Sequence, residues 1–128
     1  MRFMAMDFEA KESLLRAAWP NYIKSNGSIS SAAFKPRKLK DDTIEGVSTD
    51  RTCSRTMQES VEFMEHHIHS DSRIISVSVA DCNEIKLYLK YSPSSWNKYH
   101  TEIYSKAPNI PLENIQWKEL ALRAVLQK

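Results

Sequence analysis

The sequence predicts an α+β fold: a single domain at residues 1–128 in which a mainly antiparallel sheet is packed by about three helices. Its length suffices for one hydrophobic core but not comfortably for two. Three segments that alternate along their length follow one another in the second half, and segments with helical spacing flank them. Strands grouped in this way favour an antiparallel sheet with helices on one face.

The first element is expected to be a helix at residues 7–19. Phe8, Leu14 and Ala18 recur at helical spacing, while charged side chains fill the other face. Pro20 ends this helix, because the residue before a proline is pushed out of the α region.

Two short strands are expected next, at residues 28–34 and 46–51, with a polar loop at 35–45 between them. The first of these strands carries small side chains, which would permit the close approach of a neighbouring strand or of a ligand. The second leads toward the start of a helix.

That second helix is expected from Thr56 to about His69. Thr56 followed by Glu59 fits a capping box, which satisfies free backbone amides at the first turn. An apolar stripe at helical spacing follows: Met57, Val61, Met64 and Ile68.

The remaining elements are three strands and a last helix. Residues 75–80 and 85–91 alternate apolar and polar side chains, and the segment 81–83 between them predicts the turn of a β-hairpin. Residues 99–104 are expected to return antiparallel, and a helix is expected at 112–126.

Composition excludes several function classes. The chain has 18 Lys and Arg against 16 Asp and Glu, a net charge of +2, without the large excess of a dedicated nucleic-acid binder. Its two glycines cannot build a phosphate loop or a dinucleotide fingerprint, and no cofactor motif is present. Two cysteines suit a reducing cytoplasm, and no apolar run approaches the roughly 18 residues of a membrane span. A cytoplasmic protein without membrane contact is therefore expected.

His100 and Glu102 are the candidate catalytic residues. Side chains two residues apart on a strand project from the same face, so the carboxylate can orient the imidazole as a general-base pair requires. Tyr104 extends the same row. If this face lies open to solvent, the three side chains form only an outward polar row of the sheet.

Five residues are candidates for binding an anion: Ser31, Arg37, Ser48, Asp50 and Arg51. Arg51 precedes the expected helix start, where a guanidinium and backbone amides together bind an anion. Ser31 and Arg37 would join it across the sheet. The alternative is that Asp50 or Ser54 caps the helix and that Arg51 is solvated.

Two further features suggest macromolecular partners. Trp96 is the candidate partner-binding residue because it lies in a polar loop, where an exposed indole would contact a protein or a base; the alternative is a core position. The basic run from Lys35 to Lys40 is either a phosphate-gripping loop for nucleic acid or a solvated connection.

The histidines at positions 66, 67 and 69 admit two interpretations. His66 and His69 would share a helical face near Asp71, which suits a metal ion, but no further ligand has the spacing of a zinc site. Imidazoles at a helix C-terminus also suit the negative end of the helix dipole. No metal site is assigned to His66, His67 or His69.

Three short segments resemble a loosely defined group of small, uncharacterised bacterial proteins. They are a Ser-rich Ala-Phe-Lys segment at 30–35, a Gly-x-Ser-x-Asp segment at 46–50 and a His-x-Glu segment at 100–102. The group implies no activity. Ser48-Thr49 with Glu102 is also similar to the Ser-Thr strand and late glutamate of ADP-ribosyltransferase-like folds, although the domain is short for that fold.

Three functions remain open. The absence of a strong catalytic motif favours a non-enzymatic interaction or regulatory protein of a bacterial or mobile-element system, such as an immunity, antitoxin or inhibitor-like protein with a protein partner. The second is a small enzyme that acts on a nucleotide-like or phosphorylated ligand through His100 and Glu102. The third is a nucleic-acid binder that uses Lys35 to Lys40. The sequence does not determine the oligomeric state.

Overall fold

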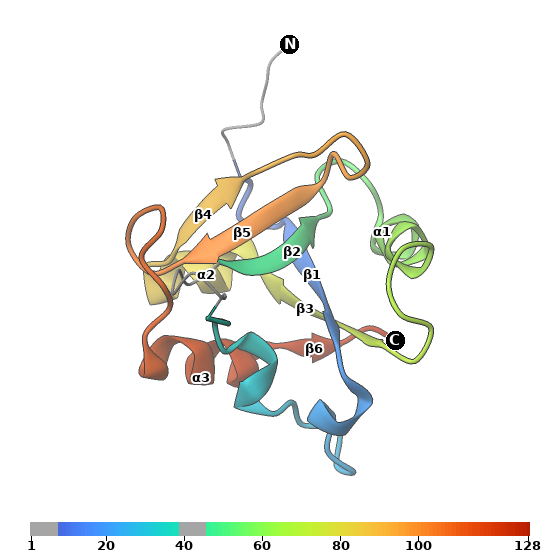
Figure 1. The fold of residues 1–128 in the computed structure, drawn as a ribbon, viewed down its shortest axis with the longest axis horizontal. Helices are drawn as coiled ribbons and strands as arrows, with labels where there is room; N and C mark the ends of the chain where they lie inside the picture. The colour runs from blue at the N-terminus through green and yellow to red at the C-terminus, as the bar shows by residue number, and fades with distance from the viewer. Residues whose placement is uncertain (1–7, 39–45) are drawn as a thin grey trace.

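A six-stranded antiparallel sheet organises the computed structural model, which describes residues 8–38 and 46–128 (Figure 1). The strands are β1 (Ser13–Ala18), β2 (Val47–Arg51), β3 (Arg73–Ser78), β4 (Tyr88–Tyr91), β5 (His100–Tyr104) and β6 (Val125–Leu126). The α-helices are α1 (Met57–Glu65), α2 (Val79–Ile85) and α3 (Asn114–Arg123), and the 3₁₀ turns are η2 (Pro20–Tyr22) and η3 (Ser31–Phe34). The strand order is β4-β5-β2-β1-β3-β6, so the predicted α+β class with a mainly antiparallel sheet is confirmed.

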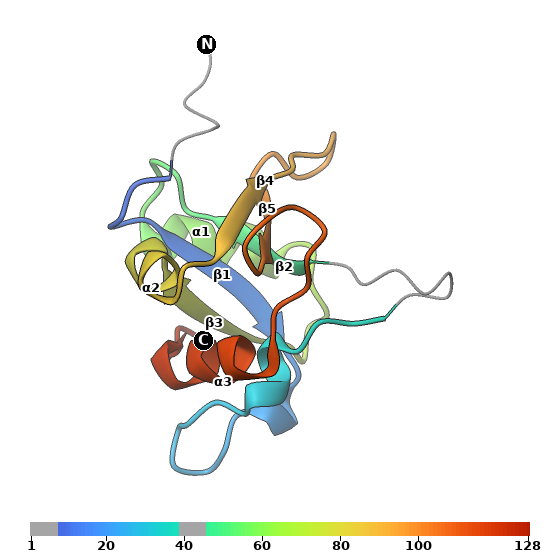
Figure 2. The same ribbon diagram turned by 90° about the vertical axis from the view of Figure 1, so that its left-hand side faces the viewer.

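Both faces of the sheet are covered, which corrects the expectation of helices on one face only. Leu14 and Leu15 are adjacent on β1 and fully buried, so their side chains enter different cores. The core around Leu14 includes residues of α2, α3 and η3, and the core around Leu15 joins Ile74 to Met64 of α1. Figure 2 shows α1 on the opposite side of the sheet from α2 and α3.

The predicted helix at residues 7–19 is wrong, because residues 13–18 form the central strand β1. A strand buried on both faces carries apolar side chains at successive positions, and here these positions also match a helical period. The predicted strand at 28–34 is wrong as well. Ser30 caps the 3₁₀ turn η3 there, because its side chain accepts a hydrogen bond from the backbone N–H of Ala32.

The predicted hairpin turn at 81–83 is instead part of helix α2. The Ser78 side chain accepts from the N–H of Asp81 at the start of this helix, and Lys86 ends it in the left-handed region with φ of 67°. As a result, β3 pairs with β1 and β6, and β4 pairs only with β5. The antiparallel return of the predicted 99–104 strand is confirmed by the β4–β5 pairing.

The capping box of the second helix is confirmed: Thr56 and Glu59 exchange both hydrogen bonds at the start of α1. This helix ends at Glu65, before the three histidines, and not near His69 as predicted. The last helix ends at Arg123, because residues 125–126 form strand β6 beside β3. Across the described residues, the helices are too short or too polar to cross a bilayer.

Candidate functional site

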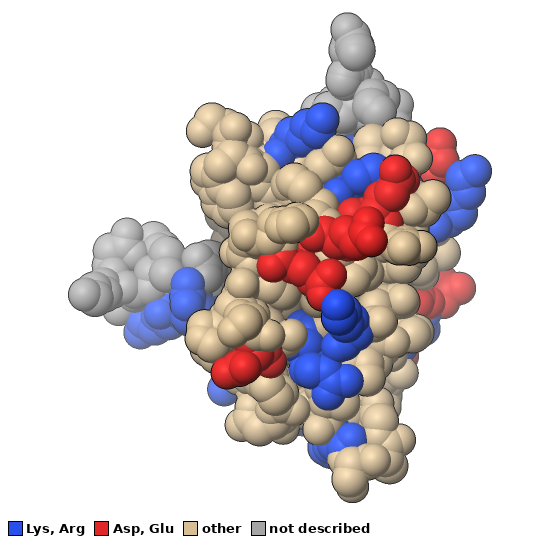
Figure 3. Space-filling view, turned by 90° about the vertical axis from the view of Figure 1, so that its right-hand side faces the viewer, with Lys and Arg blue, Asp and Glu red and all other residues tan. Residues whose placement is uncertain are grey.

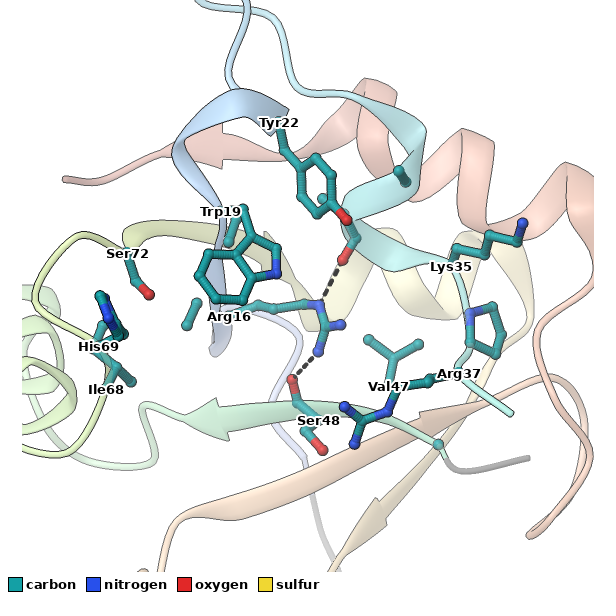
Figure 4. Close-up of a pocket in the computed structure, with 16 residues that line it drawn as sticks. Arg16, Trp19, Tyr22, Lys35, Arg37, Val47, Ser48, Ile68, His69 and Ser72 are labelled. Carbon is teal, nitrogen blue, oxygen red and sulfur yellow. Dashed lines mark hydrogen bonds between the residues drawn. The ribbon is translucent and has the colours of Figure 1, made fainter. Parts of the chain in front are cut away.

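The strands β1 and β2 separate after a ladder of only two residue pairs. Leu14 pairs with Arg51 and Leu15 with Asp50, and beyond this point the side chain of Arg16 bridges the gap. Its Nη1 donates to the carbonyl of Ser48 at 2.7 Å, and its Nε donates to the carbonyl of Ala33 at 2.6 Å (Figure 4). One guanidinium therefore connects β1, β2 and η3.

A cleft of about 780 Å³ opens where the two strands separate, within the usual size range of small-molecule pockets. It lies between η3 and the loop that follows α1, with Arg16 near its centre (Figure 4). The rings and cations of its lining are Arg16, Lys35, Arg37, Trp19, Tyr22 and His69. Among the described residues that line the cleft there is no Asp or Glu, so this part of the lining favours an anion.

The His69 side chain lines one side of the cleft and is held there by a hydrogen bond from the backbone. Its Nδ1 accepts from the backbone N–H of Asp71 at 3.2 Å. A neutral imidazole that accepts at Nδ1 carries its proton on Nε2, and a charged imidazole could not accept there. In a neutral ring the proton is therefore on Nε2.

The structure brings together only part of the predicted anion-binding group. Arg37 and Ser48 line the cleft. Ser31 does not line it, but it begins the η3 turn, and the next two residues of this turn line the cleft. Asp50 and Arg51 do not line it. The basic run that begins at Lys35 extends into residues 39–45, which lie outside the described residues.

Arg51 is used inside the protein instead of in the cleft. Its side chain is 3% exposed and forms a bidentate pair with Glu12, with Nε–Oε2 of 2.7 Å and Nη2–Oε1 of 2.9 Å. The guanidinium also lies over the rings of Phe8 and Tyr91. Burial lowers the pKa of Arg51, but the hydrogen bond and charge of Glu12 raise it above its ordinary value overall. The alternative of a solvated Arg51 is therefore wrong, and its anion-binding role stays a prediction.

His100, Glu102 and Tyr104 do form one row on β5. His100 Nε2 lies 3.3 Å from Oε2 of Glu102, and the Tyr104 hydroxyl donates to Oε1 at 2.6 Å. Ser48 pairs with Glu102 across the strands, so it shares this face, whereas Arg51 projects from the opposite one. His100 and Glu102 do not line the cleft, and their catalytic role stays a prediction.

Asp50 is buried beneath the loop that carries Trp96. Its carboxylate is 5% exposed, Oδ1 accepts from Nδ2 of Asn97 at 2.9 Å, and Oδ2 lies 3.5 Å from Nε2 of His67. The helix cap is Thr56 and not Asp50. Trp96 is 69% exposed, with its ring 5.8 Å from that of His67, so the indole is on the surface and not in the core.

The described residues contain no group of three or more His, Cys, Asp or Glu side chains arranged to hold a metal ion. The three histidines of the 66–69 segment follow α1 and do not share a helical face. His67 lies against Asp50, and His69 lines the cleft.

Comparisons of the chain with protein-family models, with curated proteins and with solved structures find no match. The candidate site therefore rests on its own geometry. The resemblance to a group of small bacterial proteins stays a prediction.

The sequence did not predict Arg16 and Trp19 as site residues, and it suggested His69 only as a possible metal ligand. Arg16 and Trp19 were assigned to a helix, and the strand geometry that directs them to the cleft depends on pairing with β2 and β3. The Trp-Pro pair was the available signal, since an aromatic residue before a proline marks a fixed, extended chain position.

Proposed function

We propose that this chain binds a small ligand that carries a phosphate or a similar anionic group, in the cleft between β1, β2 and η3. The observation that carries the proposal is the lining described above, in which Arg16, Arg37 and His69 line one cleft with no carboxylate among the described lining residues. Guanidinium groups match phosphate oxygens in geometry as well as in charge.

The fixed position of Arg16 supports this assignment. Two of its hydrogen bonds go to the backbone carbonyls of Ala33 and Ser48, which orient the guanidinium. A cation held in place before the ligand arrives loses less side-chain entropy on binding. Arg37 and Lys35 are exposed and would add to the attraction.

The proposal retains the phosphorylated-ligand hypothesis from the sequence but assigns no reaction. His100 and Glu102 lie outside the cleft, so their geometry supports no step on a ligand bound there. The bacterial origin and cytoplasmic location expected from the sequence remain part of the proposal.

Calorimetry with inorganic phosphate and pyrophosphate at low salt tests the proposal. Arg37→Gln is expected to weaken pyrophosphate binding about tenfold or more, the usual effect of losing a charge-assisted hydrogen bond. Lys98→Gln is the matched control, because it removes one exposed positive charge outside the cleft. The proposal fails if wild-type protein binds neither anion, or if both variants weaken binding equally.

A second candidate function, interaction with a protein partner, is favoured by Trp96. Tryptophan is enriched among the residues that dominate binding energies, and this indole is exposed while its edge contact with His67 restrains it. Acidic side chains gather on the α1 side of the molecule (Figure 3). Exposed Glu59, Glu62 and Glu65 belong to that helix, which ends two residues before His67.

The acidic side chains of α1 near Trp96 favour a partner with basic side chains. An immunity-like or inhibitor-like protein would need such an acidic surface to bind a cationic target. Such a partner should bind wild-type protein and lose affinity with Trp96→Ala, while Trp19→Ala, on the cleft, leaves its affinity unchanged. A partner that binds Trp96→Ala as tightly as wild type would exclude this surface. Nucleic-acid binding through Lys35 to Lys40 stays a prediction.

A further inference from the structure

Trp19 places a large aromatic surface in the cleft without covering it. The residue lines the cleft, yet 56% of its surface is exposed, in contrast to the buried side chains of β1 beside it. A Trp side chain offers 150–250 Å² of surface as a rough guide, so this exposure leaves a broad planar area open to contact.

The backbone at Trp19 is restrained on both sides. Trp19 directly follows β1 and precedes Pro20, and its carbonyl accepts from the N–H of Tyr22 to close the η2 turn. The strand on one side and the proline on the other restrict the backbone dihedrals of the residue between them. The backbone that carries the indole therefore needs little ordering when a planar ligand binds.

The neighbouring rings define which part of the indole remains open. The His69 ring lies 6.1 Å from the Trp19 ring at an angle of 55°, so the two are in direct contact and no third ring fits between them. A planar group packs instead on the indole surface that His69 leaves exposed. In Figure 4, Trp19 and Tyr22 lie above the Arg16 guanidinium, and all three residues line the cleft.

An anion site and an open aromatic surface thus share one cleft. We infer that the ligand is a nucleoside phosphate, with its phosphate at Arg16 and Arg37 and its base packed on Trp19. This inference rests on the proposed anion-binding function and names its ligand class. The same chemistry is found in a free nucleotide and in the phosphorylated end of a nucleic-acid strand, and the experiment distinguishes these two sources.

The test compares dissociation constants for ribose 5-phosphate, AMP and UMP, measured by calorimetry. Stacking on an aromatic side chain changes binding by about 5- to 150-fold per base, so wild-type protein should prefer AMP to ribose 5-phosphate by a factor in that range. In Trp19→Ala this preference should fall to about one, while ribose 5-phosphate binding changes little. Trp19→Phe keeps a ring and should retain part of the preference.

Trp96→Ala is the matched control, because it removes an exposed indole outside the cleft and should keep the full preference. Thermal unfolding of each variant confirms that it is folded. The inference is overturned if wild-type protein binds AMP and UMP no more tightly than ribose 5-phosphate, or if Trp19→Ala keeps the preference. Either result leaves anion binding intact.

Absence of binding to all three compounds and to pyrophosphate would overturn the proposed function and this inference with it. A last arm uses a 5′-phosphorylated trinucleotide. Tighter binding than AMP supports the inference with a strand end as the source of the ligand. Equal or weaker binding supports it with a free nucleotide as the source.

Discussion

At the scale of single residues, Gly46 shows how closely the chain packs beside the cleft. A Cβ added at this position would lie 2.7 Å from the Cζ of Tyr104 and 3.0 Å from the Cβ of Glu102. The Tyr104 ring cannot swing aside easily, because the residue is 4% exposed and its hydroxyl donates to Glu102. Glycine is required here by space and not by an unusual backbone angle.

We therefore expect Gly46→Ala to lower the free energy of unfolding by about 1–3 kcal/mol, the usual cost of overpacking. Denaturant unfolding measures this change. The same substitution in a Tyr104→Ala background should cost clearly less, because the ring that it strikes is gone. An equal cost in both backgrounds would contradict the contact.

At the scale of elements, the capping box makes the stability of α1 dependent on pH. The backbone N–H of Thr56 donates to the Glu59 carboxylate at 2.8 Å, and the Thr56 side chain accepts from the N–H of Glu59. The backbone hydrogen bond from Thr56, followed by the side-chain contact, holds the pKa of Glu59 below its ordinary value. A carboxylate with a lowered pKa stabilises the folded protein at pH values above its ordinary pKa. This stabilisation is lost as the pH falls through the pKa of the folded state.

Wild-type protein should therefore be more stable than Glu59→Gln near neutral pH, and this difference should shrink on acidification. Glutamine keeps an oxygen that can accept from Thr56, so the comparison isolates the charge. Thermal unfolding from about pH 7 to about pH 3 measures the difference across the pKa of a carboxyl group. Glu62→Gln controls for the loss of a negative charge from α1 outside the box. A difference that grows on acidification would contradict the assignment.

The capping box could be predicted from the sequence because it is local: two side chains three residues apart meet the backbone of the same turn. Strand β1 could not, because its assignment depends on partners far along the chain. Leu14 and Leu15 occupy separate cores only after β3 and α1 have packed against them. Helix α2 was missed because Ser78 and Asp81 suit a cap and a turn equally well.

The candidate site divides in the same way. The row of His100 and Glu102 follows from strand alternation alone and is present as predicted. The cleft needs three segments to meet, and only Arg37 and Ser48 of its lining were predicted from the sequence to bind an anion. The role of Arg51 could not be predicted from the sequence, because Glu12, its partner in the buried ion pair, lies 39 residues earlier in the chain.

At the scale of the whole molecule, Arg16 joins parts of the fold that have no continuous ladder between them. Its two hydrogen bonds reach 17 residues to Ala33 and 32 residues to Ser48. The hydrogen bond to Ala33 connects the turn η3 to the sheet. This turn packs on α3 within the core around Leu14, which includes Phe34. Loss of this side chain should therefore affect more than the cleft.

We expect Arg16→Gln to lower the free energy of unfolding by about 1.5–3 kcal/mol, the range for hydrogen bonds to charged groups. Arg37→Gln, at an exposed position, should change it by no more than about 0.5 kcal/mol. Hydrogen exchange should show faster exchange in η3 and at the separated ends of β1 and β2 for Arg16→Gln. Unchanged exchange in η3 would show that other contacts hold this turn to the sheet.

The buried pair of Glu12 and Arg51 also determines how β1 and β2 align. A ladder of two residue pairs is short enough to slip, and a shift by one residue would turn every side chain of a strand to the other face. Such a shift would separate the Glu12 carboxylate from Arg51 and break a buried ion pair, at a cost of about 3–5 kcal/mol. The ion pair thus excludes the slipped alignments. Because Arg16 reaches the carbonyl of Ser48 only in the correct alignment, a pair on one face of the sheet preserves the shape of the cleft where the strands part.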